Sequence, residues 1–372
     1  MTRKQRLMAI FEGRAPDRSA VKVWGVSPGA QSLHPAYDAV RDLGVEKTDL
    51  FGGGGSAFNI YFGTHSRELS EQFTRPTASP DWNDVVTIIH TPMGDLQGIH
   101  LQSTKKRPGY EKEYCLKEPG DIRKLLSLPY DAFPFDAEGF HKAEEQLGDA
   151  GVVMFGLDHP AYALQRMTGS ENFALWSIEH ADLMTEAIEV FAERVRAHAK
   201  AALAAGIGGI FGYVGPELCI PPLVSPPAFE RFCFDIDKPL MDLIHDAGGR
   251  VWMHCHGRMR RVIVRFADMG IDVLNPIEPP PMGDVTMAEA FELIGDRMGL
   301  EGNIETHDIM TATKEQLRAK IHDSLSAGKG RRMILCPSSG YNENPEPTAR
   351  EIENWLFYIE EGVRVAEEMA TD

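Results

Sequence analysis

Residues 249–257 read Gly-Arg-Val-Trp-Met-His-Cys-His-Gly, an apolar run that ends in three side chains able to bind a metal ion. The run is typical of a buried β-strand, and alternate residues of a strand point to the same side. His254 and His256 are therefore expected to share one face, with Cys255 on the other. If the strand ended before Met253, the chain could instead turn the Cys255 thiol inward. Both Cys255 and His256 thus stay open as the second ligand beside His254.

A further thiol follows another apolar run. Residues 333–335 are Met-Ile-Leu, Cys336 comes next, and the turn-forming Pro-Ser-Ser-Gly of residues 337–340 ends the run. Two imidazoles and one thiolate would give three protein ligands and leave a fourth position open, which is the arrangement of catalytic zinc sites. We therefore expect zinc bound by His254, His256 and Cys336. The alternative is a hydrogen-bonded core histidine and a small buried cysteine.

The fold class is indicated by short apolar strands that alternate with helical patterns over more than half of the chain. Strand, helix, strand, helix predicts a parallel sheet, and polar loops after several strands favour a (β/α)8 TIM-type barrel. An open doubly wound sheet is the alternative, but no GxGxxG follows the first strand. The expected strands are residues 152–156, 209–213, 250–254, 272–274, 298–300 and 332–335, and the clearest helices are residues 184–202 and 229–247.

The N-terminal third has a different pattern. Residues 4–13 predict a helix that ends on a glycine, and residues 20–24 a first strand. Residues 85–91 and 98–102 predict a β-hairpin, of the kind that is often inserted over one end of a barrel. No linker divides the chain, so we expect residues 1–372 to form a single barrel domain with an N-terminal helical extension.

Polar side chains follow several of the expected strands and would meet at the C-terminal face of a barrel. Each has a plain alternative, since a loop carboxylate is often only solvated and a polar residue there often caps the next helix. No GxSxG surrounds the serines, so serine hydrolysis is not expected. We expect catalytic roles for Glu217 and Asn303, and substrate contacts from Trp24, Glu278, Glu305 and Ser338.

Composition narrows the class of protein and its partners. A net charge of -17 argues against nucleic acid or an anionic membrane as a partner. Five scattered cysteines form no disulfide framework, and no long apolar segment suggests a signal peptide or a membrane span. We expect a cytoplasmic protein. The glycine run at residues 52–55 lacks the following Lys-Ser/Thr of a phosphate loop, so phosphate binding is not favoured.

Short motifs stand in a characteristic order at residues 6–13, 16–18, 91–94, 117–121, 223–226, 248–257, 270–274, 302–304 and 334–337. In that order they resemble landmarks of the uroporphyrinogen decarboxylase superfamily, and within it the branch of cobalamin-linked, often zinc-dependent methyltransferases. The decarboxylases carry an Arg-Gln-Ala-Gly-Arg-Tyr-like segment that grips porphyrinogen carboxylates, whereas residues 21–27 here are Val-Lys-Val-Trp-Gly-Val-Ser. This departure disfavours porphyrinogen decarboxylation.

The methyltransferases of this superfamily have His-x-Cys at one strand end and a second cysteine at another. His254 matches the first ligand, His256 replaces the first cysteine, and Ser339 aligns with the second, three positions after Cys336. The resemblance implies a site at the barrel mouth, and the altered ligands would make zinc a harder Lewis acid that favours oxygen-containing substrates.

The function that follows is transfer of a methyl group between a small methylated compound, with a methoxylated one favoured, and a corrinoid. The cobalamin is expected on a separate corrinoid protein, because the sequence has no Asp-x-His-x-x-Gly segment. The alternatives are a decarboxylase of a small or tetrapyrrole acid and a non-catalytic binding barrel. The resemblance also makes a homodimer an expectation.

Overall fold

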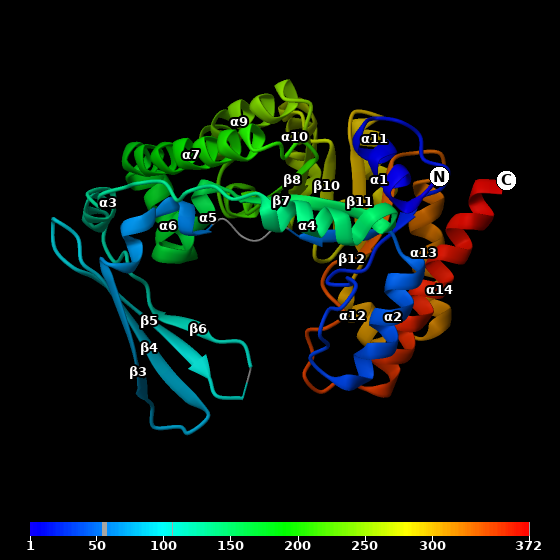
Figure 1. Cartoon of the computed structure of the whole chain (residues 1–372), viewed down its shortest axis with the longest axis horizontal. Coiled ribbons are helices and arrows are strands. Elements are labelled where there is room, and N and C mark those ends of the chain that lie inside the picture. The colour runs from blue at the N-terminus through cyan, green and yellow to red at the C-terminus, as the bar shows by residue number, and fades with distance from the viewer. Residues whose placement is uncertain (54–57, 106, 372) are drawn as a thin grey trace.

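The computed structural model describes residues 1–53, 58–105 and 107–371, and within them a barrel of eight parallel strands forms the centre of the molecule (Figure 1). Neighbouring strands follow the order β1-β12-β11-β10-β9-β8-β7-β2. At the two ends of this order, the Asp49 N–H donates to Val21 O at 2.8 Å, and the Val21 N–H donates to the Asp49 carboxylate at 2.9 Å. These bonds join β1 to the start of β2, and the (β/α)8 TIM-type fold is confirmed.

Every strand expected in the barrel is present, with small shifts at its ends. β2 was not expected, because Leu-Phe-Gly-Gly is short and glycine-rich for a strand. Of the glycine run at residues 52–55, residues 54 and 55 lie outside the described residues. The strands are β1 Ala20–Val21, β2 Leu50–Gly53, β7 Gly151–Asp158, β8 Ile210–Val214, β9 Arg250–His254, β10 Val273–Ile277, β11 Gly299–Ile304 and β12 Met333–Pro337.

Helices surround the barrel, and none of those described is both long and apolar enough to cross a membrane. The helix expected over residues 229–247 is divided by a wide π-helical turn, η6 (Glu230–Phe234). The α-helices are α1 Arg3–Phe11, α2 Asp38–Lys47, α3 Gly120–Leu126, α4 Glu138–Leu147, α5 Pro160–Thr168, α6 Ser170–Glu179, α7 Ala181–Ala204, α8 Pro226–Phe229, α9 Asp235–Asp246, α10 Ile263–Met269, α11 Met287–Ile294, α12 Thr306–Thr311, α13 Lys314–Ala327 and α14 Ala349–Thr371.

The hydrophobic core has an inner part, inside the barrel, and an outer part, between barrel and helices. Helix α1 begins with a capping box between Thr2 and Gln5, and its Leu7, Ile10 and Phe11 pack in the inner part with inward residues of the strands such as Trp252. Outward residues of the same strands belong to the outer part. This alternation fixes which side chains of each strand can reach the barrel mouth.

The expected hairpin is confirmed, and it belongs to a larger antiparallel sheet of four strands among the described residues. The sheet extends away from the barrel and lies below α3 and α6 in Figure 1. Two strands at its edges, one of them only four residues long, were not expected. The strands are β3 Ser70–Pro76, β4 Trp82–Ile89, β5 Leu96–Ser103 and β6 Tyr110–Glu113.

An ion-pair group at the N-terminus gives a prediction about acid stability. Arg6 donates to Asp17 Oδ1 and to Asp49 Oδ1, each at 2.7 Å. Burial would raise the pKa of Asp17, but Arg6 and the terminal ammonium outweigh it and lower that pKa from 3.8 to about 2. A carboxyl group whose pKa is lower in the folded state stabilises the fold above its unfolded-state pKa, and this contribution is lost as the pH falls through the folded value.

Asp17→Asn is therefore expected to lower the unfolding midpoint at pH 7, and the difference from the parent should shrink between pH 4 and about pH 2. Because Asp17 is a third exposed, the effect at pH 7 should not exceed about 1 kcal/mol. Thermal unfolding of both proteins across this pH range measures it. A difference that stays constant with pH would show that the Asp17 charge is not the cause.

Candidate site at the barrel mouth

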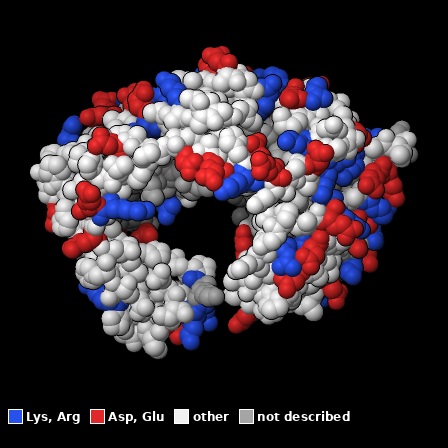
Figure 2. Space-filling view, viewed as in Figure 1, with Lys and Arg blue, Asp and Glu red and all other residues white. Residues whose placement is uncertain are grey.

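A cavity of about 690 Å³ lies at the carboxyl ends of the barrel strands. Figure 2 shows the molecule hollowed between the four-stranded sheet and the part of the barrel near α2 and α12. Four of the residues expected at the site line this cavity, together with apolar side chains such as Met154 and Trp252. The four are Trp24, His254, His256 and Ser338.

His254 ends strand β9 and points into the barrel, as the alternation of the strand predicts. Its Nδ1 lies 2.7 Å from Asn275 Oδ1 on the neighbouring strand β10. Burial, and to a lesser extent the charge of His256, lower the pKa of His254 to about 4. The imidazole is therefore neutral at neutral pH, which is the form that binds a metal ion.

His256 stands beside His254, with the two ring centroids 4.6 Å apart and the ring planes nearly perpendicular. Its Nδ1 lies 2.9 Å from Glu278 Oε1, and the other Glu278 oxygen accepts the Gly257 N–H at 2.8 Å. Burial alone would lower the pKa of His256, but the bonded Glu278 and the nearby Glu217 and Glu305 raise it. In both histidines, Nδ1 is thus within hydrogen-bond distance of a side-chain oxygen on a neighbouring segment.

Two more glutamates at the strand ends have oxygens that are buried without a hydrogen-bond partner. These atoms are Glu217 Oε2 and Glu305 Oε1. Burial raises the pKa of both side chains, and the charge of Glu278 adds to the effect. The other Glu305 oxygen accepts a hydrogen bond from Ser338 Oγ at 3.2 Å. Buried polar atoms without a partner are costly, so these oxygens fit a role toward a ligand, a metal ion or a proton.

The structure does not gather the expected ligand set of His254, His256 and Cys336. Among the described residues, the ligand atoms of these three are not all within 4.8 Å of one another. Cys336 is fully buried, and its thiol donates to Pro337 O at 3.2 Å. Burial and the nearby Glu301 carboxylate raise its pKa well above the usual value. Because this thiol lies deeper in the barrel beside an anion, the geometry argues against a thiolate ligand here.

Two other residues are placed away from the cavity. Cys255 is fully buried in the outer part of the core, so His256 and not Cys255 is the neighbour of His254. Asn303 accepts a hydrogen bond from Ser324 Oγ at 2.6 Å, and Ser324 belongs to helix α13 outside the barrel. This contact turns the Asn303 side chain toward the helix layer, which argues against the catalytic role expected for it.

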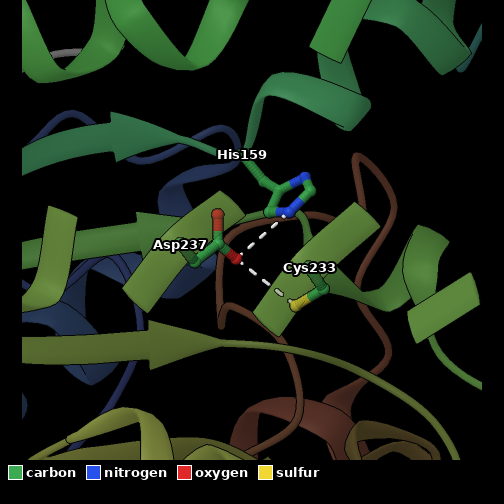
Figure 3. Close-up of side chains that lie close together, drawn as sticks. All are labelled: His159, Cys233 and Asp237. Atoms are coloured by element: carbon green, nitrogen blue, oxygen red, sulfur yellow. Dashed lines mark hydrogen bonds and ion pairs between the residues drawn. The ribbon is translucent and has the colours of Figure 1, made fainter. Parts of the chain in front are cut away.

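A second group of possible ligands, His159, Cys233 and Asp237, is buried and is shown in Figure 3. His159 Nε2 is 3.1 Å from Asp237 Oδ2, and the Cys233 thiol donates to the same oxygen at 3.3 Å. However, His159 Nδ1 accepts the Ala161 N–H at 3.0 Å, so Nε2 must carry the hydrogen of the neutral ring. A ring in this tautomer has no lone pair for a metal ion at Nε2, and the group is better described as a buried polar contact.

Three polar residues inside the barrel were missed by sequence reasoning. Lys22, Asn275 and Glu301 are all buried, and the Lys22 ammonium lies 2.8 Å from Glu301 Oε1. The signal available was a charged or amide residue at an inward position of an apolar strand, which requires a partner when it is buried. The partner of Lys22 lies 279 positions away, so the pair was not visible in any local pattern.

A barrel that gathers imidazoles and carboxylates at the carboxyl ends of its strands has the architecture of the barrel enzymes. The family model of uroporphyrinogen decarboxylase (URO-D) matches residues 89–349, which is more than half of the chain. The chain therefore belongs to the uroporphyrinogen decarboxylase family, as the motifs indicated, and characterised members of this family are enzymes of more than one kind.

The chain is similar both to methyltransferases and to decarboxylases among known proteins. Methylcobamide:CoM methyltransferase MtaA of Methanosarcina barkeri is 25% identical over 254 residues, covering 67% of this chain and 71% of that protein. Uroporphyrinogen decarboxylase of Prochlorococcus marinus is 23% identical over 297 residues, covering 77% and 80%. A solved methyltransferase from Methanosarcina mazei shares the fold, with a TM-score of 0.62, 17% identity and 99% of each chain covered.

Proposed function

We propose that this protein is a zinc-dependent methyltransferase that moves the methyl group of a small methoxylated compound to a corrinoid held by a separate protein. The proposal rests on one observation above all. His254 and His256 stand side by side at the cavity, each with Nδ1 bonded to a neighbouring oxygen, which leaves both Nε2 atoms for another ligand. Metal-binding histidines are oriented in this way in proteins generally.

A zinc site without Cys336 would need a carboxylate beside the two histidines. Among the described residues this donor set, like the Cys336 set, does not lie within 4.8 Å, so its side chains would have to close on the ion. The two histidines would supply nitrogen ligands, and Glu217 or Glu305, each with a buried unpaired oxygen, would supply a carboxylate. Two histidines and one glutamate form a known ligand set of catalytic zinc, and they leave one position open. Zinc bound there would supply a Lewis acid that polarises the ether oxygen of the substrate.

The residues of the chain itself would orient the substrate and move a proton. Trp24 and Trp252 give the cavity aromatic walls that fit a methoxylated ring. Transfer of the methyl group to a reduced corrinoid would break the carbon–oxygen bond and form a carbon–cobalt bond, and the oxygen left behind would need a proton. With Glu305 as the zinc ligand, Glu217, whose pKa burial raises, would donate that proton.

The charge of the site supports an uncharged substrate over an acid. Asp158 and Glu343 line the cavity beside the histidines, while none of the described residues that line it is a lysine or an arginine. Two like charges about 8 Å apart repel by about 2 kcal/mol at the effective dielectric constant of a protein surface. This repulsion disfavours a carboxylate that lies beside these two side chains, whereas a carboxylate that binds the zinc ion itself would be attracted by the charge of the ion. The relative named as a methylcobamide-dependent methyltransferase supports the corrinoid as the methyl carrier.

Three para-substituted methoxybenzenes whose second group is neutral, cationic or anionic test this proposal: 4-methoxybenzyl alcohol, 4-methoxybenzylamine and 4-methoxybenzoate. With zinc-loaded protein and free cob(I)alamin in place of the carrier protein, the alcohol is expected to methylate cobalt at least about 10-fold faster than the benzoate, because one such repulsion exceeds the 1.4 kcal/mol that a tenfold rate difference requires. The absorbance change of the corrinoid reports the reaction. Carbon dioxide released from the benzoate without cobalt methylation would favour the decarboxylase instead.

We also propose that residues 1–372 fold as one domain. The homodimer stays a prediction.

A further inference from the structure

A continuous chain of buried polar side chains runs through the barrel interior to His254. Lys22 Nζ donates to Glu301 Oε1 at 2.8 Å, and the Trp252 N–H donates to Glu301 Oε2 at 2.8 Å. Asn275 Nδ2 also donates to Glu301 Oε1 at 2.8 Å, and Asn275 Oδ1 lies 2.7 Å from His254 Nδ1. Strands β9, β10 and β11 each contribute at least one of these side chains, and Lys22 directly follows β1.

Lys22 and Trp252 determine the donor and the acceptor of every hydrogen bond in this series. A lysine ammonium and an indole N–H can only donate, so both Glu301 oxygens act as acceptors. Asn275 must then turn its NH2 group toward Glu301, which leaves its carbonyl oxygen facing His254. A carbonyl oxygen can only accept, and therefore His254 Nδ1 must carry the hydrogen.

We infer that Lys22, Glu301 and Asn275 are positioning residues that hold His254 in the tautomer with hydrogen on Nδ1, so that the lone pair of Nε2 is directed to the cavity. That this lone pair serves a metal ion rests on the proposed function, but the tautomer itself does not. The polar chain would thus prepare the ligand before the metal arrives, and less rearrangement would accompany binding.

Lys22 is itself held in a fixed place, which supports a positioning role for the whole chain. It is 1% exposed, and its ammonium lies 3.4 Å from the ring centroid of Trp24, 4.0 Å from that of Phe51 and 4.9 Å from that of Trp252. Cation–π contacts of this kind stabilise a desolvated cation. Trp24 and Trp252 also line the cavity, so the same rings form the substrate wall and the cage of the lysine.

The tautomer can be observed directly in metal-free protein. Nitrogen-15 NMR of histidine-labelled protein distinguishes the protonated from the unprotonated ring nitrogen, and the His254 signals are those that disappear in His254→Gln. The expected spectrum has hydrogen on Nδ1 and an unprotonated Nε2. A His254 ring with hydrogen on Nε2 in the parent protein would overturn the inference, whether or not the protein binds zinc.

Variants of Asn275 test whether this series of buried hydrogen bonds affects the binding of a metal ion. Asn275→Leu removes the acceptor and is expected to give mixed His254 tautomers and a zinc affinity about 10- to 100-fold weaker, measured by competition with a chelating dye. Asn275→Asp keeps an acceptor facing His254, but its second carboxyl oxygen replaces the amide that donates to Glu301, so one of the two carboxyl groups is expected to take up a proton. The parent tautomer of His254 should be retained. Tyr213→Phe removes a different buried hydrogen bond, to Asp237, and should change neither the tautomer nor the affinity.

The outcomes separate the two proposals. If the parent shows the Nδ1 tautomer and Asn275→Leu loses it, but zinc does not bind to any of the proteins, the positioning role stands and the proposed zinc chemistry fails. If zinc binds tightly and Asn275→Leu changes neither the tautomer nor the affinity while remaining folded by circular dichroism, the positioning role is refuted and the metal site stands.

Discussion

Lys22→Met is expected to lower the free energy of unfolding by about 3–5 kcal/mol, because it leaves the Glu301 carboxylate buried in the barrel without its cation. Both side chains of the pair are almost completely buried, and their charged atoms are 2.8 Å apart. Methionine has a similar length and fits the space between the aromatic rings, so the loss should come from the charge and not from a cavity. Urea unfolding of parent and variant measures the difference.

Two further variants show whether the buried charge is the cause. In Lys22→Met/Glu301→Gln the carboxylate is removed as well, so much of the lost stability should return. Lys142→Met breaks an exposed pair with Glu138 on helix α4 and should have no measurable effect. If Lys22→Met were as stable as the parent, Glu301 would be neutral in the folded protein, and the hydrogen-bond directions inferred for Asn275 and His254 would lose their basis.

His254→Ala is expected to reduce the rate of cobalt methylation by about 1000-fold or more. A Lewis acid at a leaving oxygen is worth several kcal/mol of transition-state stabilisation, and each 1.4 kcal/mol corresponds to a factor of ten in rate. The variant removes one of the two imidazoles that face the cavity. The measurement is the rate of methylcobalamin formation from 4-methoxybenzyl alcohol, at saturating alcohol and fixed cob(I)alamin.

The matched control is His100→Ala, which removes a partly exposed histidine of strand β5 that is bonded to Glu111. Its rate should equal that of the parent, since this imidazole lies in the four-stranded sheet and does not line the cavity. A His254→Ala protein that kept the parent rate would exclude a direct role of His254 in the reaction.

The sequence predicted the barrel and the two histidines because both depend on local patterns. Alternation along residues 249–257 determines that His254 faces inward and Cys255 outward, and the structure agrees. The end of a strand is also readable, so the polar groups that follow β9 and β12 were assigned to the correct face of the barrel.

Depth within the barrel and long-range partners could not be predicted in the same way. Cys336 was placed at the correct end of β12, but it is fully buried beside Glu301, which no pattern around residue 336 indicates. Asn303 was also placed at a strand end, yet its side chain bonds to Ser324 of a helix that follows it. Whether a side chain at a strand end points to the cavity or to the surrounding helices depends on which residues pack on each side of it, and these are distant in the sequence.

The most direct test of the zinc site is elemental analysis of protein purified without a histidine tag, for the parent, His254→Ala and Cys336→Ser. Near-stoichiometric zinc is expected in the parent and in Cys336→Ser, because the buried thiol beside Glu301 is not a ligand, and zinc should be lost in His254→Ala. A metal-free parent would contradict the account, and so would zinc that is retained in His254→Ala and lost in Cys336→Ser.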